Sequence, residues 1–125
     1  MTMSAAEVGK GLVAHCQRGD FAGAMAAYYH ADIESIEGDG SMVPAGRVRG
    51  VDACIEKGKY WQAANEVHSM TVTGPYLGDG QFAVIYDIDV TERASGNRFT
   101  GKEIGVYRVV DGKIVHENFM GLPMG

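Results

Sequence analysis

The spacing of apolar residues changes about halfway along the chain, and this change constrains the fold more than any other feature. In the first half they recur at three- and four-residue intervals, as in Val8, Leu12 and Cys16, which is the spacing of one face of a helix. From His68 onward the period is two, most clearly over residues 82–90, as expected of strands. Helices followed by a run of strands define the α+β class, with the helices packed on one face of a curved sheet.

Three helices are predicted before the period changes. The first covers residues 5–18 and ends at Gly19, and Asp20 can cap a second over residues 21–29. The third begins after Gly50. Five strands are predicted, one between the second and third helices and four after the third: 32–37, 68–72, 82–90, 101–110 and 113–120. The connections between them are rich in turn residues and cover 38–46, 74–80, 93–97 and 111–112.

The strand over residues 101–110 carries apolar groups on both of its faces. Tyr107 and Val109 lie on one face, while Ile104 and Val106 lie on the other. Three helices can cover only one face of the sheet, and an exposed apolar face of several residues usually marks an interface. We therefore expect a homodimer that forms through the outer face of the sheet.

Composition and charge exclude several classes of protein. The net charge is −5 and the 11 Lys and Arg residues are scattered, so a nucleic-acid partner is not expected. No apolar run approaches the length of a membrane span, and the first ten residues lack the pattern of a signal peptide. The 125 residues predict a single domain over 1–125, and a cytoplasmic location is the expectation.

Metal and cofactor motifs are absent from the sequence. The four histidines, His15, His30, His68 and His116, have no metal-ligand spacing, and neither of the two cysteines has a CxxC partner. The glycine-rich stretch 38–46 lacks the lysine of a phosphate-binding loop. No metal and no cofactor are therefore expected.

Two stretches carry a resemblance to a known family: GRVRGVDACI at 46–55 and ASGNRFTGKEIGVYRVVDGKIVHENF at 94–119. With the order of elements, they resemble the SnoaL-like branch of the nuclear transport factor 2-like superfamily, over roughly residues 8–120. That superfamily includes polyketide cyclases, ketosteroid isomerases, limonene-epoxide hydrolases and non-catalytic domains. The resemblance implies a cone, in which a strongly curved, mostly antiparallel sheet wraps the helices and leaves a pocket at its open end. It also implies dimers through the outer sheet face.

The resemblance also assigns side chains to the two faces of the sheet. The residues that it places toward the pocket are Val84, Tyr86, Ile88, Glu103, Gly105, Tyr107, Val115, Glu117 and Phe119. In the last strand it places Ile114, His116, Asn118 and Met120 toward the partner subunit.

Glu37 is the candidate catalytic residue, because it falls where the ketosteroid-isomerase relatives carry a proton-shuttling carboxylate. A carboxylate at an apolar cavity wall loses hydration, which raises its pKa and makes it a better base. The alternation in residues 32–37 leaves open whether Glu34 or Glu37 faces inward. A solvated glutamate at the edge of a loop is the alternative.

Two departures from the family pattern argue against steroid isomerisation by the known constellation. Leu12 and Gly105 stand where ketosteroid isomerases carry a tyrosine and an acid that hold the enolate oxygen. Gly105 and Phe119 replace acids of the polyketide cyclases, and Glu117 stands where a histidine is common.

The remaining inward groups form the predicted binding site: Tyr28 (with Tyr29 as the alternative), Trp61, His68, Tyr86, Glu103, Tyr107, Glu117 and Phe119. Such a wall predicts a small apolar ligand with few polar handles. Two functions follow. One is proton transfer, cyclisation, isomerisation or hydration of a small apolar carbonyl compound or epoxide, with Glu37 as base. The alternative is a non-catalytic module of the same fold that binds a ligand or dimerises.

Overall fold

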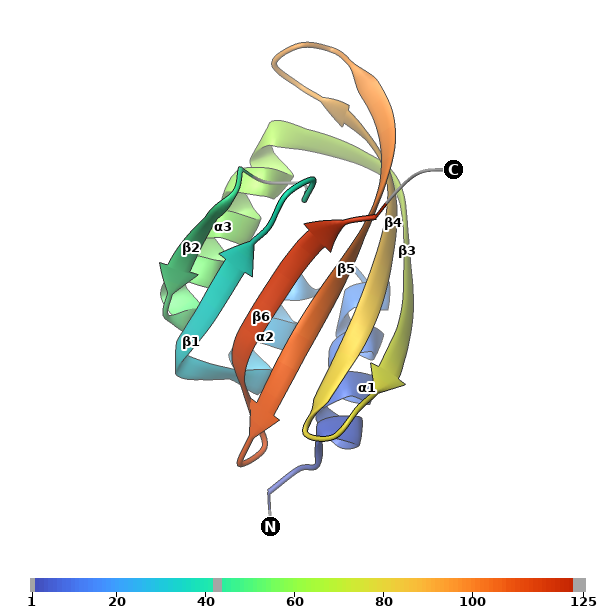
Figure 1. The fold of residues 1–125 in the computed structure, drawn as a ribbon. Coiled ribbons are helices and arrows are strands. Elements are labelled where there is room, and N and C mark those ends of the chain that lie inside the picture. Colours follow the sequence, from blue (N-terminus) through green and yellow to red (C-terminus); the bar gives the residue numbers. More distant parts are fainter. Residues whose placement is uncertain (1, 42–43, 123–125) are drawn as a thin grey trace.

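The α+β prediction is confirmed. The computed structural model of the chain describes residues 2–41 and 44–122, and the central part of the predicted loop 38–46 lies outside them. Three helices pack on one side of a six-stranded, strongly curved and open sheet (Figure 1). The helices are α1 (Ala5–Gln17), α2 (Phe21–Tyr28) and α3 (Val51–Ala64).

The helix boundaries follow from capping side chains. The Ser4 hydroxyl accepts a hydrogen bond from the Glu7 N–H, and the Glu7 carboxylate accepts one from the Ser4 N–H, so α1 begins with a capping box. Asp20 accepts from the Gly23 N–H and starts α2. Within 2–41 and 44–122, no helix is both long enough and apolar enough to span a membrane.

The strands form one mixed sheet in the order β2-β1-β6-β5-β4-β3. They are β1 (Tyr29–Glu37), β2 (Gly46–Arg49), β3 (Asn65–Leu77), β4 (Gln81–Glu92), β5 (Arg98–Val110) and β6 (Lys113–Gly121). The pair β1 and β6 is parallel and every other pair is antiparallel, which confirms a mostly antiparallel sheet. Strand β2 is not among the predicted strands, because four residues without apolar alternation give no strand signal. The predicted strand 68–72 is longer in the structure, since β3 begins at Asn65 and continues through most of the predicted turn 74–80.

A bulge in β6 overturns one predicted side-chain direction. Arg108 pairs with His116 but Val109 pairs with Ile114, so Val115 is an extra residue opposite β5. An extra residue reverses the alternation of side chains before it. As a result, Ile114 is fully buried in the core rather than directed toward a partner.

The core lies between the helices and the concave face of the sheet. Val8 and Leu12 of α1 pack with Phe82 and Val84 of β4, and all four are at most 1% exposed. The Phe82 ring stacks on Tyr107 with centroids 4.9 Å apart. Toward the opposite end of the helices the packing is incomplete, and a cavity remains there.

Candidate functional site

A cavity of about 160 Å³ lies between the sheet and the three helices. Its wall is mainly apolar and aromatic. The side chains that line it are Leu12, Cys16, Phe21, Ala22, Ala24, Met25, Tyr29, Glu37, Cys54, Ile55, Lys57, Lys59, Trp61, Gln62, Met70, Tyr86, Ile88, Glu103, Tyr107, Glu117 and Phe119, together with the backbone of Gly58.

A second hollow, of about 380 Å³, adjoins the cavity and is called here the vestibule. The residues that line both are Cys16, Phe21, Trp61, Gln62 and Met70. Gln17, Arg18, Gly19 and Val67 line the vestibule alone. The vestibule therefore lies beside the cavity, next to the α1–α2 connection and the α3–β3 junction.

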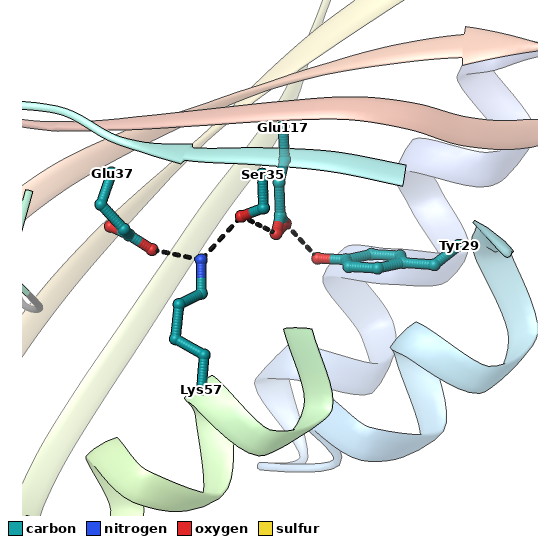
Figure 2. A network of polar contacts seen from close by, with 5 residues as sticks. All are labelled: Tyr29, Ser35, Glu37, Lys57 and Glu117. Atoms are coloured by element: carbon teal, nitrogen blue, oxygen red, sulfur yellow. Dashed lines mark hydrogen bonds and ion pairs between the residues drawn. The ribbon is translucent and has the colours of Figure 1, made fainter. Parts of the chain in front are cut away.

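A buried carboxyl group, that of Glu117, stands at the centre of a polar network in the cavity wall (Figure 2). Its side chain is fully buried. The Tyr29 hydroxyl donates a hydrogen bond to Oε1, and the Ser35 hydroxyl donates to Oε2 over 2.8 Å. Strand β6 supplies Glu117, and its parallel neighbour β1 supplies the two donors.

Lys57 of α3 extends the network to Glu37. Its Nζ lies 2.6 Å from Ser35 Oγ and 2.7 Å from Glu37 Oε1. The Lys57 and Glu37 side chains are 19% and 9% exposed, so this ion pair is largely shielded from water. Nζ also lies 5.5 Å from the centroid of the Phe119 ring, within the range of a cation–π contact.

Burial raises the pKa of the Glu117 carboxyl above its ordinary value of 4.5, because a low-dielectric surrounding disfavours the charged form. The hydrogen bond from Tyr29, the Lys57 ammonium and the hydrogen bond from Ser35 act in the opposite direction. The Glu37 carboxylate raises the pKa further. Glu117 is thus a buried acid whose charge depends on its neighbours.

The structure decides between the two glutamates of β1. Glu37 is 8% exposed and lines the cavity. Glu34 lies on the other face of the strand, where it forms ion pairs with Arg47 at 3.5 Å and with Arg49 at 3.7 Å. The alternative of a solvated loop-edge position for Glu37 is therefore wrong.

Burial also keeps the tyrosine and cysteine side chains of the wall protonated. The Tyr86 and Tyr107 hydroxyl oxygens lie 2.6 Å apart, and burial raises the pKa of both phenols. Burial raises the pKa of Cys16 and of Cys54 to about 12. Since a thiol is a weak nucleophile compared with its thiolate, neither cysteine has the environment of a reactive one.

Two predicted binding residues do not line the cavity. Strand β1 begins at Tyr29, and the Tyr29 side chain lines the cavity. The Tyr28 ring instead packs against the His15 ring in an edge-to-face arrangement, with ring centroids 5.8 Å apart. His68 falls at a register irregularity between Val67 and Ser69. Its exposed side chain contacts the Thr91 hydroxyl.

The other predicted residues do line the cavity: Glu37, Trp61, Tyr86, Glu103, Tyr107, Glu117 and Phe119. Sequence reasoning missed Ser35 and Lys57 and gave Tyr29 only as an alternative. A signal for Lys57 was present, because it follows Cys54 by three positions and precedes Trp61 by four, which puts all three on one helix face. Ser35 shares the inward alternation of Glu37.

Packing explains why glycine occupies position 105. A Cβ atom there would lie 2.8 Å from Phe119 Cε1 and 3.0 Å from the Tyr107 ring. The Phe119 ring fills the space that an acidic side chain would need. Within the described part of the chain, no group of three or more His, Cys, Asp or Glu side chains is arranged to hold a metal ion.

Fold and cavity together define a cone-fold protein with a polar cluster inside an apolar pocket. The SnoaL-like domain family matches residues 3–120, and the chain belongs to this family. The comparison with curated proteins gave no match.

Solved structures agree with this assignment. A protein from Mesorhizobium loti, provisionally described as a SnoaL-like polyketide cyclase, is 39% identical, with a TM-score of 0.86 over 94% of this chain and 98% of that one. An NTF2-like protein from Burkholderia thailandensis is 21% identical, with a TM-score of 0.83 over 97% and 92% of the two chains. A protein with a cystatin-like fold from Xanthomonas campestris is 18% identical, with a TM-score of 0.71 over 97% and 92%. The last two show the fold alone.

Proposed function

We propose that the cavity binds a small apolar compound that carries a carbonyl group, and that Glu37 removes and returns a proton on the carbon beside it. The observation that carries this proposal is the Glu37–Lys57 pair. A carboxylate and an ammonium group lie 2.7 Å apart in the wall of a mainly apolar cavity. Proton transfer of this kind underlies isomerisation and cyclisation of carbonyl compounds, and the similarity to a protein described as a polyketide cyclase supports it.

Lys57 would supply the positive charge that the reaction needs. Removal of the proton moves negative charge onto the carbonyl oxygen, and a fixed cation in a site with little water stabilises that charge strongly. The positions equivalent to the oxygen-holding groups of ketosteroid isomerases are Leu12 and Gly105, and neither can donate a side-chain hydrogen bond. A carbonyl oxygen beside Nζ would lie close to the base, because Nζ already contacts Glu37.

The size and lining of the site favour an apolar ligand. A cavity of about 160 Å³ holds a ring or a short chain, and the vestibule offers room for a longer substituent. Trp61 and Met70 line both spaces, so the same side chains would contact the ligand along its length. A few polar groups in an apolar pocket fix orientation, while shape provides most of the selection.

Non-catalytic binding is the second candidate, and one observation favours it. Both Glu117 oxygens and the Lys57 ammonium already have hydrogen-bond partners within the network. A network of this kind can serve to hold β1, β6 and α3 together beneath a passive pocket. The two candidates predict the same ligand class but different effects of Glu37.

Deuterium incorporation in heavy water separates the candidates without knowledge of the natural substrate. Cyclohexanone and decalone are suitable probes, because proton removal beside their carbonyl group exchanges hydrogen for deuterium. We expect the protein to accelerate this exchange, and Glu37→Gln to slow it by about 10²-fold or more, because the substitution removes the base.

Glu34→Gln is the matched control, since it makes the same change on the outer face of the same strand. It should leave the exchange unchanged. Binding of the ketones with no acceleration by the wild-type protein would contradict catalysis and leave the binding function. Equal rates for the wild type and Glu37→Gln, each checked for folding by circular dichroism, would remove Glu37 as the base.

A further inference from the structure

We propose that the buried network shares one carboxyl proton, which resides on Glu117 while Glu37 is ionised. We further propose that Glu117 exchanges this proton with Lys57 through the Ser35 hydroxyl. Glu117 would thus be a positioning residue and a proton reservoir, acting behind the groups that meet the ligand. The shared proton follows from the charges of the network alone. The exchange with Lys57 during catalysis rests on the proposed function.

The network has more buried acids than its cation can neutralise. Lys57 Nζ contacts Glu37 directly at 2.7 Å, whereas the Ser35 hydroxyl stands between Nζ and Glu117. An ionised Glu117, which is fully buried, would be a second negative charge facing one ammonium that already has a carboxylate partner. An uncompensated buried charge is costly, and a proton on Glu117 removes it.

The other titratable and charged groups that interact electrostatically with Glu117 do not change this count of buried charges. They come from each element packed around it: Cys16 of α1, Tyr29 and Glu37 of β1, Cys54 and Lys57 of α3, Tyr86 of β4 and Tyr107 of β5. Burial keeps the thiols and phenols protonated, so only Lys57 and Glu37 contribute full charges. Glu103 and Lys59 also line the cavity, but Glu103 is half-buried and Lys59 is exposed and paired with Glu56.

The Ser35 hydroxyl connects Lys57 to Glu117, because it accepts a hydrogen bond from one and donates to the other. An ammonium can only donate, so Ser35 Oγ accepts from Lys57 and its own proton points to Glu117 Oε2. If Lys57 loses a proton, its nitrogen becomes an acceptor. The hydroxyl can then turn toward Nζ while the Glu117 carboxyl donates to Oγ, and the direction of the chain is reversed.

The proposed step conserves protons. Glu37 takes the carbon-bound proton, the C–H electron pair forms the C=C bond of the enol, the C=O π pair moves to the oxygen, and Lys57 gives that oxygen a proton to form a neutral enol. The Glu117 carboxylic acid then gives its proton to Ser35, which passes its own to the Lys57 amine. When Glu37 returns a proton to carbon, the enol proton travels back through Lys57 and Ser35 to Glu117.

Carboxyl ¹³C NMR on glutamate-labelled protein tests the shared proton without any ligand. The Glu117 signal is assigned by its absence in Glu117→Gln or, if that variant does not fold, by its displacement in Tyr29→Phe. We expect its titration midpoint to lie above 4.5, the ordinary value. In Glu37→Gln the midpoint should fall, because the Lys57 ammonium can then neutralise Glu117, and in Lys57→Met it should rise.

Glu34→Gln is again the control and should leave the Glu117 midpoint unchanged. A wild-type midpoint at or below 4.5 would overturn the proposal. So would a midpoint that does not move in Glu37→Gln, because the two carboxyls would then not share a proton.

The pH profile of deuterium exchange tests the relay separately. In the wild type, exchange should decline on the alkaline side at the midpoint that NMR gives for Glu117. Ser35→Ala should slow exchange by about 10²-fold and abolish this decline, although Glu117 keeps its raised midpoint. An unchanged alkaline decline in Ser35→Ala would overturn the relay. Absence of exchange in the wild type would contradict the proposed function and the relay, while the titration still decides the shared proton.

Discussion

At Glu117, burial strongly disfavours the charged form of the side chain. It is fully buried, yet its contacts are the hydroxyl groups of Tyr29 and Ser35 rather than a cation. Hydrogen bonds from neutral hydroxyls only partly replace the hydration that a carboxylate loses. The protein therefore holds an acid whose ionisation works against folding.

Glu117 should make the stability of the protein depend on pH in a defined direction. Its pKa in the folded state is raised above 4.5, so between 4.5 and the folded value the folded state binds more protons than the unfolded state. Stability is then highest below the unfolded pKa and is lost as pH rises through the folded pKa. Urea unfolding across this window should show the wild type losing free energy of unfolding relative to Glu117→Gln.

The control for this pH series is Glu34→Gln, which should follow the wild type at every pH. A difference between the wild type and Glu117→Gln that is constant with pH would show that Glu117 does not change its protonation on folding.

At the scale of elements, β1 and α3 determine the site, because β1 places three members of the network and α3 places Lys57 against them. Lys57 and the backbone of Gly58 lie in the cavity wall on the same face of α3 as Cys54 and Trp61. A Cβ atom at Gly58 would meet Met25 Cε at 3.6 Å, an ordinary van der Waals distance. The glycine is thus not required by the packing of α3 against α2.

Two Gly→Ala substitutions should therefore have opposite effects on stability. Gly58→Ala should raise the free energy of unfolding by about 1 kcal/mol, because alanine favours a helix interior. Gly105→Ala should lower it by about 1–3 kcal/mol, because its Cβ would lie 2.8 Å from Phe119 Cε1 in a packed wall. Urea denaturation measures both, and a stabilising Gly105→Ala would contradict the described packing of Phe119.

The elements were predictable where the apolar period was long, as over β4 and most of α1. Residues 46–49 lack that period, and a bulge such as the one at Val115 leaves no mark in a single sequence. In the site, Glu37 was identified through resemblance, whereas Lys57 was not, because lysines on helices are usually solvated. Only the packing of α3 against β1 shows that this ammonium contacts the Glu37 carboxylate directly and is joined to Glu117 through the Ser35 hydroxyl.

At the scale of the whole molecule, no helix of the described chain covers the outer face of the sheet (Figure 1). Ile85 of β4 and Ile104 of β5 are directly paired on it and half-buried. Next to them, Met120 of β6 pairs with Ile104 and is 41% exposed. We propose that a second copy of the chain packs on this apolar face.

Light scattering at micromolar concentration should then give twice the chain mass of 13.4 kDa. Such a dimer should bury at least about 1,200 Å² in total. Ile104→Asp should produce monomers, because it places a charge in the interface. Tyr60→Asp on α3, at a side chain 67% exposed, is the control and should remain dimeric. A monomeric wild type would contradict the proposal.

The central claim is that the cavity is a binding site for a small apolar carbonyl compound, and tryptophan fluorescence tests it most directly. Trp61 is the one tryptophan in the sequence, and it lines both the cavity and the vestibule. We predict that cyclohexanone or decalone changes this fluorescence saturably, whereas adenosine monophosphate and glucose do not. Saturable binding of the nucleotide or the sugar, with no response to the ketones, would contradict the account.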